Sequence, residues 1–151
     1  MEIERKFLIK KLPADLEQYE CLHIEQAYLC TSPVIRIRKQ NDEYYLTYKG
    51  SGLLAHEEYN LPLTKESYEH LRKKVDGNII SKKRYLIPIK NSTLKVELDI
   101  FDAPFSALII AEVEFPDIES ANAFEPLSWF ADDVTSNPNY HNSNLSTRPL
   151  K

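Results

Sequence analysis

Glycine is scarce in this sequence, and its scarcity excludes two common phosphate-binding loops. Only Gly50, Gly52 and Gly77 occur among the 151 residues. A Walker P-loop and the GxGxxG dinucleotide fingerprint each need glycines at fixed spacings, and the sequence contains neither pattern. If the chain binds phosphate groups, its side chains must therefore make most of the contacts.

Cysteine is also scarce. Cys21 and Cys30 form no CxxC pair, and two cysteines do not build the disulfide framework of a small secreted domain. Cys21 lies close to His23 in the sequence, but no second ligand pair follows at zinc-finger spacing. Because free cysteine is among the residue types most often buried, a packed side chain is a better interpretation than a metal ligand.

The sequence has no long hydrophobic run. Charged residues follow Met1 directly, where a signal peptide would be apolar. The longest apolar run, 107–113, contains Glu112 and is far too short to cross a bilayer. We therefore expect a soluble protein in a reducing, cytoplasmic setting, with no membrane partner.

Neither sign of charge dominates the composition. The 19 basic and 23 acidic side chains leave a formal net charge of −4, which gives no general attraction to nucleic acid. We expect no nucleic-acid partner, and any strongly basic site has to be local. The length suits one domain with a sizeable core, so we interpret 1–151 as a single domain.

Strand signals dominate the hydrophobic pattern. Alternation with period two, together with many β-branched and aromatic residues, is typical of strands. Eight are predicted, at 2–9, 23–30, 34–40, 43–49, 57–63, 79–89, 94–101 and 108–115. Mostly sequential strands with few helices indicate a mainly β (α+β) fold, in which an antiparallel sheet closes into a barrel or curves strongly.

Two helices are predicted between and after the strands. Thr64 can cap a helix that runs to about Asp76 and ends at Gly77. A second helix is expected from near Asp117 to the proline at 126. The segment 127–134 is expected to form a third short helix, and the tail from 135, rich in Asn, Ser and Pro, is expected to be irregular.

The charged residues of the predicted strands recur in same-sign pairs. Alternation places Glu2, Glu4 and Lys6 on one face of the first strand and Arg5 on the other. An ordinary antiparallel sheet with its polar face in water is the plain interpretation. Two glutamates at one strand spacing repel each other, however, unless something positive lies between them. Similar same-face pairs are Arg36 with Arg38, Lys82 with Arg84, Glu97 with Asp99, and Glu112 with Glu114.

Converging acidic and basic side chains have a use in phosphate chemistry. Carboxylate oxygens are the ligands that Mg²⁺ and Mn²⁺ prefer, and arginine binds phosphate oxygens through two parallel hydrogen bonds. A barrel interior with this many charges has to contain water, because dry burial would be prohibitive. The residues alone therefore suggest a wet, charged tunnel for a metal–polyphosphate complex, with the solvated sheet as the alternative.

The opening residues, 2–7, resemble the ExExK signature of the CYTH domain family, the triphosphate tunnel metalloenzymes. Further elements follow in the family's order: Gln26-Ala27-Tyr28-Leu29, Arg36-Ile37-Arg38, Leu46-Thr47-Tyr48-Lys49, Lys82-Lys83-Arg84-Tyr85, Glu97-Leu98-Asp99 and Glu112-Val113-Glu114-Phe115. The similarity covers nearly the whole chain and is closest to the short bacterial members. It implies an eight-stranded antiparallel tunnel, with a few flanking helices, that hydrolyses a triphosphate with Mg²⁺ or Mn²⁺.

The resemblance also implies roles for individual residues. Tyr28 lies where short bacterial members carry a tyrosine near the active site, although a packed barrel tyrosine is an alternative. The implied catalytic residues are Glu4, Tyr28 and Lys82. The implied metal ligands are Glu2, Glu4, Glu58, Glu112 and Glu114, with Asp99 as an additional ligand or a group behind the ligands. The implied triphosphate contacts are Lys6, Arg36, Arg38, Lys49, Lys82 and Arg84.

Two departures from the family pattern are visible. An ExE-like pair usually follows the Thr-x-Lys motif; here Glu58 is kept, but Asn60 replaces a carboxylate and removes a negative charge from a second metal site. Related proteins often place basic residues around a Tyr-x-Asn pattern near the C-terminus, and 138–143 contains none. We therefore expect the tail to contribute less to substrate binding or to closing the tunnel.

The function expected from the resemblance is hydrolysis of inorganic triphosphate to pyrophosphate and phosphate. Nucleoside or thiamine triphosphatase activity and a class IV-type adenylyl cyclase are alternatives within the family, although no aromatic clamp for adenine can be assigned. A non-catalytic module that binds polyphosphate or nucleotide is a further alternative, motivated by Asn60. A plain structural barrel is the last one, and a homodimer is left open.

Overall fold

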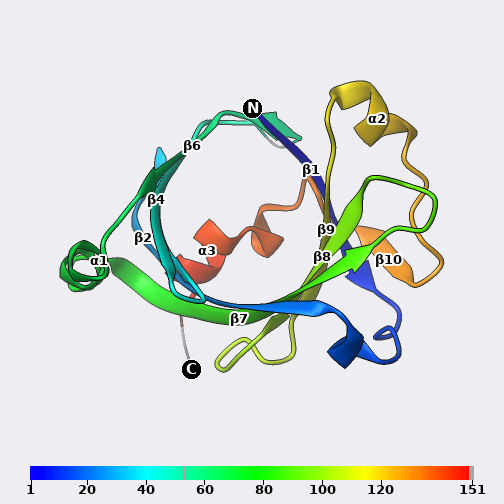
Figure 1. Cartoon of the computed structure of the whole chain (residues 1–151). Helices are drawn as coiled ribbons and strands as arrows, with labels where there is room; N and C mark the ends of the chain where they lie inside the picture. Colours follow the sequence, from blue (N-terminus) through cyan, green and yellow to red (C-terminus); the bar gives the residue numbers. More distant parts are fainter. Residues whose placement is uncertain (53, 150–151) are drawn as a thin grey trace.

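One antiparallel sheet, wound into a barrel, dominates the computed structural model, which describes residues 1–52 and 54–149 (Figure 1). The strands are β1 Glu2–Ile9, β2 Glu20–Thr31, β3 Val34–Gln40, β4 Glu43–Lys49, β5 Ala55–His56, β6 Glu58–Pro62, β7 Asp76–Pro88, β8 Lys95–Phe101, β9 Ile109–Glu114 and β10 Phe130–Asp133. The helices are α1 Lys65–Arg72, α2 Ile118–Ala123 and α3 Asn142–Thr147, with single 3-10 turns at Leu16–Gln18 and Pro138–Tyr140.

The sheet closes on itself through the segment 55–62. Hydrogen-bonded neighbours run in the order β10-β1-β9-β8-β7-β2-β3-β4-β6. At the far end of this path β6 pairs with β4, while β5, just before β6 in the chain, pairs with β1 and sets His56 opposite Glu2. In the end-on view of Figure 1 the strands therefore surround a central space.

The predicted fold class is confirmed, and the strand count differs slightly. The predicted strands 2–9, 34–40 and 43–49 match β1, β3 and β4 at both ends. The predicted strand 57–63 corresponds to β6, and the short β5 just before it, which pairs with β1, was not predicted. Together β5 and β6 close the ring. Counting this pair as one interrupted strand gives eight around the ring, with β10 added beside β1.

The first two helices are correctly placed, but the first is shorter than predicted. A capping box joins the side chains of Thr64 and Ser67 to each other's backbone N–H at the start of α1, and Asp117 caps α2. Helix α1 ends at Arg72 because Asp76 already pairs with β2 as the first residue of β7. Gly77 therefore lies in a strand, with φ of 72°, and does not end the helix.

Two predictions for the last quarter of the chain are wrong. The segment 127–134 contains β10 in place of a helix, because Phe130 and Asp133 pair with β1 and Phe130 stacks on Phe7 with ring centroids 4.7 Å apart. The tail is not irregular throughout, since it contains the helix α3. Asn78 on β7 fastens α3 by donating hydrogen bonds to the carbonyls of Leu145 and Arg148, at 3.0 and 2.7 Å.

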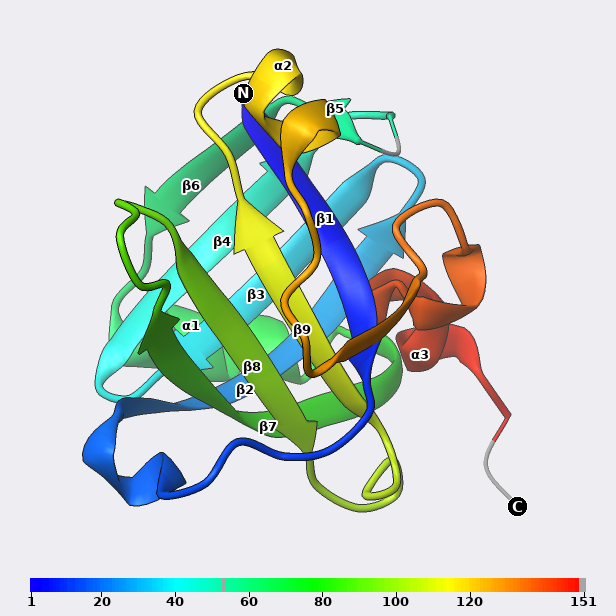
Figure 2. The ribbon, with the colours of Figure 1, turned by 90° about the vertical axis from the view of Figure 1, so that its right-hand side faces the viewer.

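Apolar packing lies on both sides of the barrel wall. One cluster outside the wall packs β1, β8 and β9 against α2 and β10, and another packs β2 and β3 against α1. A third cluster includes Ile80, Phe101 and Ile110, which lie two residues along their strands from Lys82, Asp99 and Glu112 and so share the inner face with them. Leu145 of α3 joins this cluster. Helix α3 covers one end of the barrel (Figures 1 and 2). The apolar side chains of the third cluster pack against Leu145 of this helix.

The length of the helices and the state of the cysteines can be read directly from the structure. No helix within residues 1–52 and 54–149 is both long and apolar enough to cross a membrane. Cys21 and Cys30 are both free thiols, each partly buried. The interior of the barrel is apolar at the end that α3 covers and strongly charged over the rest.

Candidate active site

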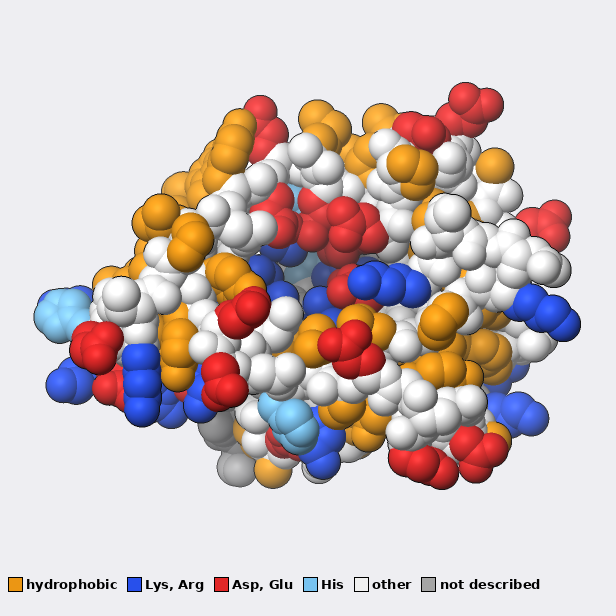
Figure 3. All heavy atoms as spheres, in the orientation of Figure 1, with side chains coloured by type: hydrophobic (Ala, Val, Ile, Leu, Met, Phe, Trp, Pro, Cys, Tyr) orange, Lys and Arg blue, Asp and Glu red, His pale blue; other side chains and the backbone are white. Residues whose placement is uncertain are grey.

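The charged side chains that alternate along the strands meet inside the barrel. Between β1 and β9, Glu4 lies opposite Glu114 and Lys6 lies opposite Glu112. The space-filling view along the barrel shows acidic side chains at the rim of a hollow and basic side chains within it (Figure 3). A cavity of about 50 Å³ is lined there by Glu2, Glu4, Lys6, Arg36, Arg38, Lys49, Glu58, Arg84, Glu97, Glu112 and Asn142.

A carboxylate pair flanks the lysine of β1. Lys6 Nζ lies 3.9 Å from Glu4 Oε1 and 3.8 Å from Glu112 Oε1, and all three side chains are buried. Burial, with the negative charge of Glu112 next, raises the pKa of Glu4 to about 8. Without a metal ion Glu4 therefore holds a proton at neutral pH, in a place where a divalent cation could replace it.

A second acidic group lies where the ring closes. Glu2 Oε1 is 2.5 Å from His56 Nε2 and 3.1 Å from Lys49 Nζ, and Glu58 Oε2 lies 3.7 Å from the same ammonium. Glu114, by contrast, is exposed at the mouth, and burial and the charges of Glu2, Glu97 and Glu58 raise its pKa. The predicted acidic ligands thus come from three strands and gather near one end of the barrel.

A buried carboxylate holds two of the basic groups. Asp99 accepts hydrogen bonds from Arg84 Nε at 2.7 Å and from Arg84 Nη2 at 2.9 Å, and Lys82 Nζ lies 2.7 Å from its Oδ2. Asp99 is fully buried and Lys82 is 1% exposed. Burial lowers the pKa of Lys82 to about 7, although Asp99 opposes this effect. Both oxygens of Asp99 therefore already bind cationic side chains.

The two arginines of β3 lack acidic partners. Arg38 donates from Nε and Nη2 to Gln26 Oε1 at 3.0 and 2.6 Å, and Arg36 donates from Nη2 to Thr47 Oγ1 at 3.2 Å. Among the described residues neither guanidinium pairs with a carboxylate, and Arg36 Nε has no partner. Burial and the charges of Arg36 and Arg84 lower the pKa of Arg38. An entering anion would relieve this repulsion.

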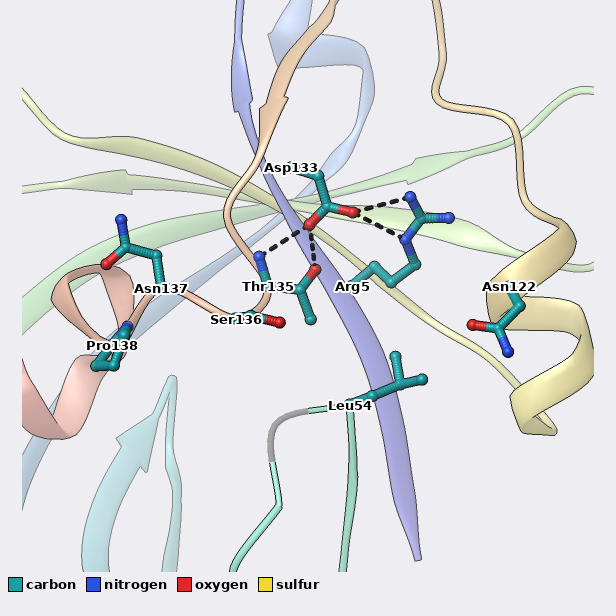
Figure 4. A pocket seen from close by; sticks show the side chains of 8 residues that line it. All are labelled: Arg5, Leu54, Asn122, Asp133, Thr135, Ser136, Asn137 and Pro138. Atoms are coloured by element: carbon teal, nitrogen blue, oxygen red, sulfur yellow. Dashed lines mark hydrogen bonds and ion pairs between the residues drawn. The ribbon is translucent and has the colours of Figure 1, made fainter.

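A larger cavity, of about 720 Å³, lies outside the wall and lacks such unpaired charge (Figure 4). Arg5, on the outer face of β1 as predicted, donates from Nη1 to the carbonyls of Ala121 and Phe124, at 2.9 Å each. Its Nη2 lies 2.8 Å from Asp133 Oδ2, and Asp133 also accepts from Thr135. These contacts connect α2 and β10 to β1, so the charged groups of this outer cavity are already paired with each other. The candidate site for phosphate binding is therefore the charged interior of the barrel.

Comparison with known proteins agrees with this arrangement. Residues 1–148 match the CYTH domain family. This chain is a CYTH protein. It is 35% identical over 148 residues to an inorganic triphosphatase of Nitrosomonas europaea, covering 96% of each chain. It is also 35% identical over 159 residues to an inorganic triphosphatase of Acetivibrio thermocellus, covering 99% of this chain and 96% of that one.

A solved structure described as an inorganic triphosphatase has the same fold. It superimposes on the CYTH protein with a TM-score of 0.75 and 31% sequence identity, covering 100% of this chain and 97% of the other. The similarity therefore extends over the whole barrel together with α3, and includes every strand that carries a predicted site residue.

The asparagine that departs from the usual CYTH pattern is part of the site's hydrogen bonding. Asn60 Oδ1 accepts from Thr47 Oγ1 at 2.6 Å, and its Nδ2 donates to Glu58 Oε1 at 3.1 Å. Thr47 in turn is the partner of Arg36. Asn60 thus connects an acidic side chain to a basic one, which a carboxylate at this position could not do with the same donors.

The tail of the CYTH protein contributes to the site, contrary to the expectation from its lack of basic residues. Asn142 lines the charged cavity, and its Oδ1 accepts from Lys82 Nζ at 3.3 Å. His141 and Ser143 line an adjoining cavity of about 100 Å³, to which Tyr28 also contributes. Tyr28 is 3% exposed and belongs to the apolar cluster with Leu145, so it packs in the barrel wall while also lining that cavity.

Sequence reasoning missed His56, His141 and Asn142. His56 lies on a two-residue strand with no alternation to detect, and it reaches Glu2 only because the ring closes there. The tail residues lie in a short helix and its cap. A polar Asn-His pattern within an otherwise irregular tail was the only signal available for them.

Proposed function

We propose that this CYTH protein hydrolyses inorganic triphosphate to pyrophosphate and phosphate with the help of a divalent cation. Two relatives named inorganic triphosphatase, each 35% identical over nearly the whole chain, support the proposal. The observation that carries it is the arrangement of the interior. The buried carboxylates of Glu4 and Glu112 line one small cavity with Arg36 and Arg38, two arginines that pair with no carboxylate within residues 1–52 and 54–149.

The carboxylates of the interior suit a hard divalent cation such as Mg²⁺ or Mn²⁺. The raised pKa of Glu4 indicates that a further negative charge at this position is unfavourable unless a cation binds there. The residues that would hold the metal are Glu2, Glu4, Glu58, Glu112 and Glu114. When bound, a divalent cation polarises phosphoryl oxygens and neutralises their charge.

The basic side chains bind and orient the triphosphate. Phosphoryl transfer asks the protein mainly for positioning and electrostatic stabilisation. Arg36 and Arg38 offer guanidinium groups that pair with no carboxylate in the described part of the chain, and arginine matches phosphate oxygens through paired hydrogen bonds. The full set of triphosphate contacts is Lys6, Arg36, Arg38, Lys49, Lys82 and Arg84.

Asp99 acts in this proposal as a positioning residue. It lies behind Lys82 and Arg84 and fixes both by hydrogen bonds. Because its oxygens are occupied in this way, its contribution is to hold Arg84 at the cavity wall and Lys82 directly behind that wall. An ionised lysine and arginine at this depth would otherwise be costly to bury.

Lys82 is suited to move a proton. A pKa of about 7 means that its amine is partly unprotonated at neutral pH, so Nζ can accept a proton. Its side chain is fully buried behind the cavity wall, where Nζ contacts Asn142 of the cavity lining. Tyr28 closes the adjoining cavity on one side and limits the space for the terminal phosphate. Glu4 completes the catalytic set by binding the cation.

The size of the cavities favours inorganic triphosphate over a nucleotide. The two charged cavities measure about 50 and 100 Å³, whereas pockets for larger organic ligands measure about 300–1,000 Å³. Apolar side chains and α3 fill the barrel end beyond them. An adenylyl cyclase or a nucleoside triphosphatase would need room for a base next to the charges.

The test is phosphate release from inorganic triphosphate, with ATP in parallel, in Mg²⁺, Mn²⁺ and a chelator. The protein should carry no N-terminal tag, because Glu2 follows Met1 directly. Glu4→Gln keeps the side chain's size and should largely abolish metal-dependent release. The matched control is Glu66→Gln, which changes an exposed residue of α1 and should retain full activity.

Three results would contradict the proposal. Wild-type rates in Glu4→Gln would remove Glu4 from the mechanism. Preference for ATP, with cyclic AMP among the products, would favour a cyclase. A triphosphate-induced rise in melting temperature without any phosphate release would indicate a binding module.

A further inference from the structure

A histidine and two carboxylates converge where the ring of strands closes. Their ligand atoms, one each from Glu2, His56 and Glu58, all lie within 4.8 Å of one another. Glu2 comes from β1, His56 from β5 and Glu58 from β6, so the group exists only in the closed barrel. It is the one nitrogen-containing group of this kind within the described residues.

Both carboxylates of the group lie against a single positive side chain. The side chains of Glu2 and Glu58 are mostly buried, at 15% and 19% exposed. The ammonium of Lys49, 3.1 Å from Glu2 Oε1 and 3.7 Å from Glu58 Oε2, currently provides the positive charge.

Two buried polar atoms of the group make no hydrogen bond within the described residues. They are His56 Nδ1 and Glu58 Oε2. The His56 side chain is 10% exposed, and a buried polar atom without a hydrogen bond costs about 1–3 kcal/mol. Since buried unpaired groups are rare in native proteins, these two indicate that the site is completed by something else.

We propose that Glu2, His56 and Glu58 bind a divalent cation through a mixed nitrogen and oxygen donor set, which favours Mn²⁺ over Mg²⁺. Mg²⁺ prefers oxygen ligands alone, whereas first-row transition ions accept imidazole nitrogen as well. The inference deepens the proposed function and rests on it, because the ion would occupy the metal-binding end of the same interior.

Binding of the ion has a consequence for Lys49. The cation takes over the neutralisation of Glu2 and Glu58, so the ammonium is released from both carboxylates. Lys49 also lines the charged cavity together with Arg36 and Arg38. The freed ammonium is therefore available to a phosphate oxygen, which couples occupation of the metal site to triphosphate binding.

The test measures Mn²⁺ binding to the metal-free protein, without triphosphate. Electron spin-echo spectra of bound Mn²⁺ should show coupling to an imidazole ¹⁴N nucleus, and labelling the protein with ¹⁵N-histidine should remove that coupling. In His56→Asn the coupling should vanish, and calorimetric titration should show Mn²⁺ affinity reduced by about tenfold or more. Affinity for Mg²⁺ should change much less.

His141→Asn is the matched control. His141 lines the adjoining cavity, but its Nε2 lies 3.2 Å from the carbonyl oxygen of Thr135, so this variant should keep the nitrogen coupling. Absence of ¹⁴N coupling in the wild type, its survival in His56→Asn or its loss in His141→Asn would each overturn the proposal. The isotope experiment decides the question even if His56→Asn does not fold.

The same preparations separate this inference from the proposed function. Nitrogen-coordinated Mn²⁺ without any triphosphate turnover would support the metal site and refute the hydrolase. Turnover with bound Mn²⁺ that shows no nitrogen coupling would support the hydrolase and refute a role for His56 as ligand.

Discussion

Replacing Glu4 by Gln should stabilise the metal-free protein while destroying its activity. Glu4 lies among buried groups, next to the carboxylate of Glu112. Burial and this neighbour raise the pKa of Glu4 from 4.5 to about 8. Ionising Glu4 without a metal is therefore unfavourable in the folded state, and the neutral glutamine amide avoids this cost.

The direction and size of the effect follow from the two pKa values. Because the folded-state pKa lies above the unfolded-state value, the stability that goes with protonated Glu4 is complete below about pH 4.5. It is lost as the pH rises through about 8. At 1.36 kcal/mol per pKa unit, the loss in the wild type reaches up to about 5 kcal/mol, or about 10–20 °C in melting temperature.

The assay is thermal and urea unfolding of chelator-treated wild type and Glu4→Gln across this pH interval. The two proteins should have similar stability at its lower end, and the variant should be the more stable at its upper end. Added Mg²⁺ should recover the lost stability of the wild type alone. Parallel pH curves for the two proteins would refute the reasoning, since Glu4 would then titrate with an ordinary pKa.

Three further predictions concern the support of the site. Asp99→Asn should lower the free energy of unfolding by about 3–5 kcal/mol, because it leaves Lys82 and Arg84 buried without this carboxylate. Urea unfolding measures this loss, and KM for triphosphate should rise as well. Gly77→Ala should loosen α3 from the barrel, because a Cβ at φ 72° would lie 2.0 Å from the Ser146 carbonyl oxygen, which hydrogen exchange of α3 amides would reveal. Thr64→Ala removes the cap of α1 and should cost about 1 kcal/mol without changing KM.

Alternation along strands is what made the acidic and basic stripes predictable. Every second residue of a strand points to the same face of the sheet. Glu4 and Lys6 could therefore be assigned to one face and Arg5 to the other without knowing which strands pair. The structure places the first two inside the barrel and Arg5 outside, against α2. The boundaries of β1, β3 and β4 followed from the same pattern, because turn residues interrupt it.

Features that depend on long-range pairing could not be predicted in this way. His56 faces Glu2 only through the ring closure, and no local pattern specifies which strand closes a barrel. The helix predicted over 127–134 failed because pairing of Phe130 with β1 overrides local preference. The contribution of Asn142 also depends on tertiary packing, since β7 holds α3 in place through Asn78.

The pairing of β1 also determines when the site can exist during folding. Glu4 on β1 lies opposite Glu114 on β9, and seven strands, β2 to β8, lie between them in the chain. Such distant contacts form late and slowly, because the chain between them must first be ordered. Before then the carboxylates are dispersed along a solvated chain and repel one another little. Cation binding at neutral pH is therefore a property of the finished barrel, and the rate at which it appears after dilution from denaturant would report the last closure of the ring.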